Sequence, residues 1–71
     1  MPLQEQKRLV NLVDDLANKG PLQPEWPNFS KLGSNEYHCH LSLHWVACWR
    51  EIELGVEIEV YYAGSREKAP Y

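Results

Sequence analysis

Residues 36–71 decide the fold, and they read EYHCHLSLHWVACWREIELGVEIEVYYAGSREKAPY. At the start of this stretch, apolar side chains alternate with polar ones, and the apolar positions are Tyr37, Cys39, Leu41 and Leu43. A period of two is typical of a strand that buries one face and exposes the other to water. The polar face of this strand is therefore one place to look for a functional site.

Two further strands are predicted at hairpin distance from the first, over residues 45–50 and 56–63. In the second of these, the apolar positions are Val56, Ile58, Val60 and Tyr62. Gly55 lies in the connection, where a residue that tolerates positive φ suits a tight turn. The sequence thus predicts a three-stranded antiparallel sheet over residues 36–64, followed by a basic tail over residues 65–71.

A helix is predicted over residues 3–19. Its apolar residues recur at the spacing of one helical face, and they are Leu9, Leu12, Val13, Leu16 and Ala17. Gly20 can adopt the left-handed capping conformation, and Pro21 cannot continue a helix, so the helix should end there. Because an isolated helix of about 15 residues is marginal in water, this one has to pack on the sheet.

The segment between helix and sheet, residues 20–35, contains three prolines and Gly33. These residues disfavour regular structure, while Trp26 and Phe29 are too apolar to leave in water. We therefore expect an ordered loop over one edge of the core. The predicted fold class is α+β, with one N-terminal helix packed on a three-stranded antiparallel sheet in a single domain over residues 1–71.

Composition limits the classes of protein that fit the chain. The 71 residues are 44% hydrophobic and 24% charged, as in an ordinary globular domain. No apolar run approaches the roughly 20 residues of a membrane span, so we expect a cytoplasmic protein without a membrane partner. Cys39 and Cys48 lack the multi-pair spacing of a secreted disulfide scaffold, which favours reduced thiols while leaving a bridge between them possible.

Charge is distributed unevenly along the chain. The net charge is −3, and all of it comes from residues 36–71, since the charges of residues 1–35 balance. Proteins that bind nucleic acid usually cluster lysine and arginine instead, to neutralise phosphates. Charge alone therefore argues against RNA binding.

A group of possible metal ligands lies in the first two predicted strands, and its members are His38, Cys39, His40, His44 and Cys48. Zinc needs about four converging nitrogen or sulfur ligands. Cys39 should point away from the histidines, and the spacing matches no common zinc pair. We expect no metal and no cofactor, with zinc binding by His38, His40 and Cys48 kept as an alternative.

A second group is basic and aromatic, and consists of Arg50, Arg66, Lys68 and Tyr71. Arg50 should lie on the sheet face opposite Trp45, Ala47 and Trp49, and the tail can bring the other three nearby. Cations beside a phenol are the groups that metal-free RNA cleavage would use. The same residues could simply form a solvated end of the chain, since positive charges in a tail are common.

Three sequence runs, taken in order, resemble a known family. They are YHCHL at 37–41, VACW at 46–49 and EVYYAGSREKAPY at 59–71. The chain resembles the RelE/ParE toxin superfamily, in particular the cytotoxic translational repressors of type II toxin–antitoxin systems, in a short form lacking the family's N-terminal strand. The resemblance implies a toxin that inhibits translation by metal-independent mRNA cleavage at the ribosome, with the ribosome, mRNA and an antitoxin protein as partners.

The resemblance also implies residue roles. Arg50 would contact phosphate, Arg66 would replace the family's tail histidine, Lys68 would add charge, and Tyr71 would be the family's terminal tyrosine. The chain departs from the family in that histidine, in a shortened hairpin after the first strand, and in its acidic charge. A non-catalytic protein-binding module with a minimal RelE/ParE-like fold is the alternative, and the excess of tryptophan and tyrosine on so small a fold is consistent with it.

Overall fold

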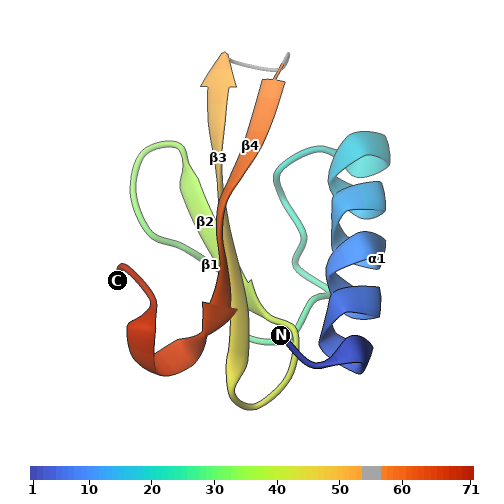
Figure 1. The fold of residues 1–71 in the computed structure, drawn as a ribbon. Coiled ribbons are helices and arrows are strands. Elements are labelled where there is room, and N and C mark those ends of the chain that lie inside the picture. Colours follow the sequence, from blue (N-terminus) through green and yellow to red (C-terminus); the bar gives the residue numbers. More distant parts are fainter. Residues whose placement is uncertain (54–56) are drawn as a thin grey trace.

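One helix covers one face of a sheet, and the end of the chain crosses the other face (Figure 1). The structure is a computed structural model that describes residues 1–53 and 57–71. The elements in chain order are α1 (Leu3–Lys19), β1 (Ser30–Lys31), β2 (Glu36–His40), β3 (Trp45–Glu53), β4 (Glu57–Ser65) and the 3-10 turn η1 (Arg66–Lys68). The α+β class and the single N-terminal helix are therefore confirmed.

The helix α1 has the predicted bounds. Gly20 follows it with φ 87° and ψ −171°, a backbone region essentially restricted to glycine, and its N–H donates to the carbonyl oxygen of Leu16 at 3.1 Å. Only Leu12 and Leu16 of the predicted stripe are fully buried, whereas Val13 remains 47% exposed. The helix thus docks on the sheet through a narrower face than its sequence pattern predicted.

The sheet has four strands in the order β1-β2-β3-β4, so the prediction of three was wrong. The missed strand, β1, is two residues long and exposed, and it pairs antiparallel with β2 through Ser30↔His38 and Lys31↔Tyr37. Neither residue carries an apolar alternation that sequence could reveal. What holds β1 in place is the neighbouring strand rather than its own composition.

The other strands differ from prediction mainly at their ends. β3 continues to Glu53, beyond the expected residue 50, and β4 runs to Ser65. Leu43 was expected to pack but is 69% exposed, because β2 ends at His40. The expectations for Val56 and the Gly55 turn fall outside the described residues.

The core lies between α1 and the sheet. Its buried members are Leu12, Leu16, Tyr37, Cys39, Leu41, Ala47 and Trp49. Phe29 stacks on both Tyr37 and Trp49, with ring centroids 5.9 and 6.0 Å apart, and Trp49 Nε1 donates to the carbonyl oxygen of Pro21 at 2.9 Å. The loop of residues 20–35 is therefore packed against the core edge, as expected, although β1 forms within it.

Candidate functional site

The two faces of the sheet have different surroundings. Tyr37, Cys39, Ala47 and Trp49 point into the core under α1. On the opposite side, the β2–β3 register places His38 across from Cys48 and Glu36 across from Arg50. We call this opposite side the tail face, because the residues that follow β4 lie over it (Figure 1).

Backbone and side-chain hydrogen bonds turn the chain from β4 onto the tail face. The N–H of Arg66 donates to the carbonyl oxygen of His44 at 2.8 Å, and Tyr62 Oη donates to that of Ser65 at 2.7 Å. The Tyr62 hydroxyl lies over Gly64, where a Cβ would come within 2.9 Å of it. A glycine at this position therefore lets the tyrosine brace the turn into η1.

Tyr71 returns to the centre of the tail face. Its ring lies on that of His38, with centroids 4.4 Å apart and planes at 53°, while Ser30 Oγ is 2.9 Å from His38 Nδ1. His38 is therefore buried, although the period-two pattern placed it on a solvated face. Burial, assisted by the neighbouring Cys48, raises the pKa of Tyr71, and the cation of Arg66 opposes this rise.

His40 is the more accessible histidine of the pair. Its ring centroid is 5.8 Å from that of His38, and its Nδ1 is 3.2 Å from Asn28 Nδ2. Burial lowers the pKa of His40, with smaller contributions from His38 and from the positive charge of Arg66. A partly exposed imidazole whose neutral form is favoured near an arginine can accept a proton at neutral pH.

Arg50 lies on the same face but is already engaged. Its Nε is 3.5 Å from Glu59 Oε1, close enough for an ion pair, yet this nitrogen makes no geometrically satisfactory hydrogen bond. Its guanidinium also stacks over the Tyr61 ring, 4.1 Å from the centroid. With Glu36 directly across the ladder, the local charge disfavours an anion here.

The predicted site residues are therefore partly brought together. Arg66 is near enough to Tyr71 and to His40 to shift the pKa of both, and Lys68 is exposed on the adjoining turn η1. Arg50 is held by Glu59 and Tyr61 instead. The sequence pattern had suggested His38 and His40 as possible metal ligands or as residues of a polar sheet face. Their shared strand face, next to the predicted tail, is the signal that could have placed them near Arg66 and Tyr71.

Cys39 and Cys48 do not form a set of metal ligands with His38 and His40. Burial, with a contribution from Cys48, raises the pKa of Cys39 to about 12, and burial raises that of Cys48 to about 11 against a hydrogen bond with Tyr61 that lowers it. Both cysteines are free. Within residues 1–53 and 57–71, no three His, Cys, Asp or Glu side chains gather as a metal ion would require.

In the part of the chain that the structure describes, no helix has the length and apolar character needed to cross a membrane.

Comparison with known proteins finds no matching family model, curated protein or solved structure. The structure therefore establishes the fold class, a small α+β domain of one helix and four antiparallel strands. The resemblance to RelE/ParE toxins stays a prediction based on the order of its sequence runs.

Proposed function

We propose that this protein is a toxin of the RelE-like type that cleaves mRNA at the ribosome without a metal ion. The observation that carries the proposal is the placement of His40, Arg66 and Tyr71 on one sheet face, where the arginine acts electrostatically on both other groups. A proton acceptor, a proton donor and a cation are the three groups that such a cleavage needs.

The chemistry assigns one role to each group. The His40 imidazole removes the proton of a ribose 2′-hydroxyl, whose oxygen attacks the adjacent phosphorus and forms the new O–P bond. The bond from phosphorus to the 5′ oxygen breaks, and the Tyr71 hydroxyl protonates that oxygen. Arg66 and Lys68 stabilise the extra negative charge of the phosphorane. The products are a 2′,3′-cyclic phosphate and a free 5′-hydroxyl.

Arg50 has a different place in this proposal. Because Glu59 and Tyr61 already engage its guanidinium, it would maintain the sheet near the site instead of contacting phosphate. The role that the family resemblance implies for Arg50 therefore remains a separate prediction.

The net charge of −3 affects how the protein would bind its RNA substrate. An acidic domain gains little from counterion release on free RNA, so the ribosome would have to present the message. The hypothesis that the protein is a toxin also implies an antitoxin partner that inhibits the cleavage activity.

Cleavage of ribosome-bound mRNA tests the proposal, mapped by primer extension and by analysis of the 3′ ends. The wild type should leave 2′,3′-cyclic phosphates, and His40→Gln or Tyr71→Phe should slow cleavage by roughly 10²–10⁴-fold, as expected for loss of a general acid or base. His44→Gln is the matched control, because His44 is exposed in the β2–β3 connection.

Intact mRNA in the presence of folded wild-type protein would contradict the proposal. If Arg50→Gln abolished cleavage while His40→Gln did not, the site predicted from sequence would replace the one built on His40. A tight protein complex formed without any growth arrest on expression would instead support the non-catalytic binding module.

A further inference from the structure

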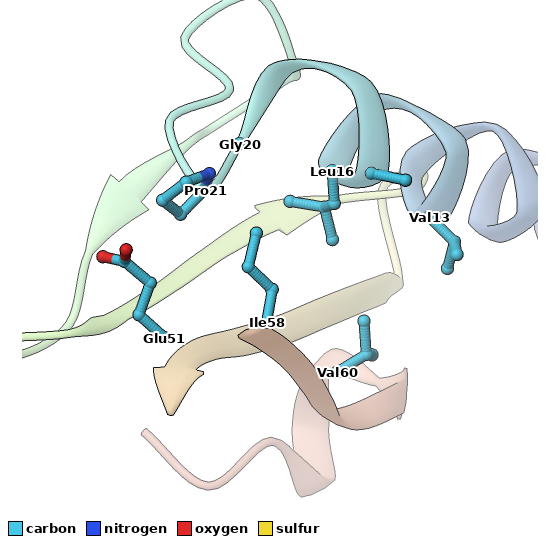
Figure 2. A pocket seen from close by; sticks show the side chains of 8 residues that line it. Val13, Leu16, Gly20, Pro21, Glu51, Ile58 and Val60 are labelled. Atoms are coloured by element: carbon cyan, nitrogen blue, oxygen red, sulfur yellow. The ribbon is translucent and has the colours of Figure 1, made fainter. Parts of the chain in front are cut away.

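The loop of residues 20–35 brings Asn28 to one of the proposed reacting groups. The loop begins on the helix side of the sheet, where Pro21 lines a groove between α1 and β4 (Figure 2). It ends in β1, which pairs antiparallel with β2, and continuing the register of that pair beyond β1 places Asn28 across from His40. Asn28 is therefore a neighbour of the His40 side chain.

The position of Asn28 is fixed by the residues on either side of it. His40 donates its backbone N–H to the carbonyl oxygen of Pro27 at 2.8 Å, and Phe29 stacks on two aromatic rings of the core. Asn28 has a φ of 55°, and it is the only non-glycine residue with a positive φ in the part of the chain that the structure describes. Asparagine tolerates this left-handed conformation better than most residues do.

The side-chain contact between Asn28 and His40 defines the state of the imidazole. Asn28 Nδ2 lies 3.2 Å from His40 Nδ1, and an amide nitrogen donates hydrogen bonds but does not accept them. His40 Nδ1 must therefore be the acceptor, which leaves the proton of the neutral ring on Nε2. Nδ1 is then the basic nitrogen of His40, and an N–H donor occupies it.

The surroundings of His40 favour this neutral ring. Burial lowers the pKa of His40, and the side chains that add to this effect among the described residues are His38 on the same strand and Arg66 on η1. Protonation of Nδ1 would in addition break the hydrogen bond from Asn28 and bring two N–H groups together. The contact with Asn28 therefore favours the form of the ring that can act as a base.

We propose that Asn28 is a positioning residue for His40, which holds the ring proton on Nε2 and keeps Nδ1 as the nitrogen that accepts the proton of the RNA 2′-hydroxyl. The contact between the two side chains is exposed, so a hydroxyl can displace the amide and donate in its place. The proton then moves from the 2′ oxygen to Nδ1, and the electron pair of that oxygen forms the bond to phosphorus. This inference rests on the proposed function, because it names the nitrogen that acts as the base there.

Long-range ¹H–¹⁵N correlation spectra of the full ¹⁵N-labelled chain test the position of the proton, at a pH where the ring is neutral. The signals of His40 are identified by their loss in His40→Gln. The wild type should show an unprotonated Nδ1 and a protonated Nε2. A proton on Nδ1 in the wild type would overturn the proposal.

Asn28→Asp changes the hydrogen bond while keeping the size of the side chain. A carboxylate accepts hydrogen bonds, so the ring proton should move to Nδ1 and the pKa of His40 should rise. Asn35→Asp is the matched control, because Asn35 is exposed in the connection between β1 and β2, and it should leave the wild-type tautomer in place. The same tautomer in Asn28→Asp as in the wild type would also overturn the proposal.

Cleavage of ribosome-bound mRNA gives the second measurement. Asn28→Asp should slow cleavage by roughly 10²-fold or more, even though a higher pKa makes a stronger base, because the proton now occupies Nδ1. Asn28→Gly accommodates the same φ and loses one exposed hydrogen bond, which changes an equilibrium by at most about tenfold. Its rate should therefore stay within about tenfold of the wild-type rate, and thermal unfolding should show that both variants are folded.

The two measurements distinguish failure of this inference from failure of the proposed function. Equal cleavage by Asn28→Asp and the wild type would overturn the positioning by Asn28 and would leave the proposed function standing. The expected tautomer in a wild type that leaves mRNA intact would overturn the proposed function, while supporting the placement of the ring proton by Asn28.

Discussion

The two cysteines show how a side chain's surroundings set its chemistry. Cys39 and Cys48 are both fully buried, although they point to opposite faces of the sheet. Burial raises the pKa of the two thiols to about 12 and about 11, from an ordinary 9.0. Since the thiolate is the reactive form, both residues should behave as small apolar side chains in the folded protein.

This behaviour can be measured by alkylation at pH 9. The folded protein should react with iodoacetamide on the order of 100-fold more slowly than the denatured chain, because each unit by which a pKa rises removes about tenfold of the thiolate. Single variants, Cys39→Ala and Cys48→Ala, separate the two sites, and Cys39 should be the slower. Alkylation of the native protein at the denatured rate would contradict the burial of these thiols.

The pKa of His40 depends on a specific neighbour. Burial, His38 and Arg66 each lower it from the ordinary 6.5. Its charged form is therefore disfavoured, and His40 stays neutral to a lower pH than a free histidine. Arg66→Gln should raise the pKa of His40 toward 6.5, as read from the imidazole signals in an NMR titration.

The control for this titration is Lys19→Gln, which removes a cation from the end of α1. It should leave the His40 titration unchanged. A wild-type pKa above 6.5, or an equal effect of both variants, would mean that Arg66 does not face His40. If His40 is the general base, the acidic limb of the cleavage rate should also move upward in pH in Arg66→Gln.

At the scale of single elements, Gly20 ends the helix by its backbone conformation. Its φ of 87° and ψ of −171° lie in a region that other residues avoid. Gly20→Ala should therefore reduce the free energy of unfolding by roughly 1–3 kcal/mol, measured from chemical denaturation midpoints. Nothing lies within 4 Å of the added methyl group, so the loss would be conformational rather than steric.

Gly33→Ala provides the matched control. Gly33 does not have a positive φ, and an added Cβ would meet Glu36 atoms only at 3.9 Å and beyond. This variant should be neutral or should stabilise the protein by about 0.4–1 kcal/mol through the unfolded state. Equal losses in the two variants would show that backbone conformation at Gly20 is not what ends α1.

Elements with strong periodic patterns were predictable from the sequence, and short or context-dependent ones were not. The bounds of α1 followed from its apolar spacing and from Gly20, and the alternation around Tyr37 and Cys39 located β2. Ser30 and Lys31 form β1 only because β2 lies beside them. The pairing of distant segments leaves no local signal in so short a strand.

At the scale of the whole molecule, the sheet separates two surfaces, and what covers the polar one could not be predicted from the sequence. The alternation identified one packed face and one polar face, but the tail that covers His38 depends on the turn after β4. Arg66 and Tyr71 were predicted to gather near the sheet, whereas the pairing of Arg50 with Glu59 required the β3–β4 register. Charge partners across strands become visible only once the register is known.

These two surfaces should also differ in their contribution to stability. A domain of this size has a free energy of unfolding of about 4–10 kcal/mol. Leu12 is fully buried between helix and sheet, so Leu12→Ala should cost about 2–5 kcal/mol and lower the melting temperature of the whole domain in one transition. Tyr71 is 52% exposed on the tail face, and Tyr71→Ala should cost less than about 1 kcal/mol, as is usual for side chains outside the core.

Thermal unfolding followed by far-ultraviolet circular dichroism compares the two variants directly. Because the Tyr71 ring lies on the His38 ring, Tyr71→Ala should move the NMR signals of the His38 ring protons, by removing the ring current of the phenol, while the melting temperature stays close to that of the wild type. If Tyr71→Ala instead unfolded the domain as Leu12→Ala does, the tail would be part of the core. Loss of RNA cleavage in Tyr71 variants would then report unfolding instead of the loss of a proton donor.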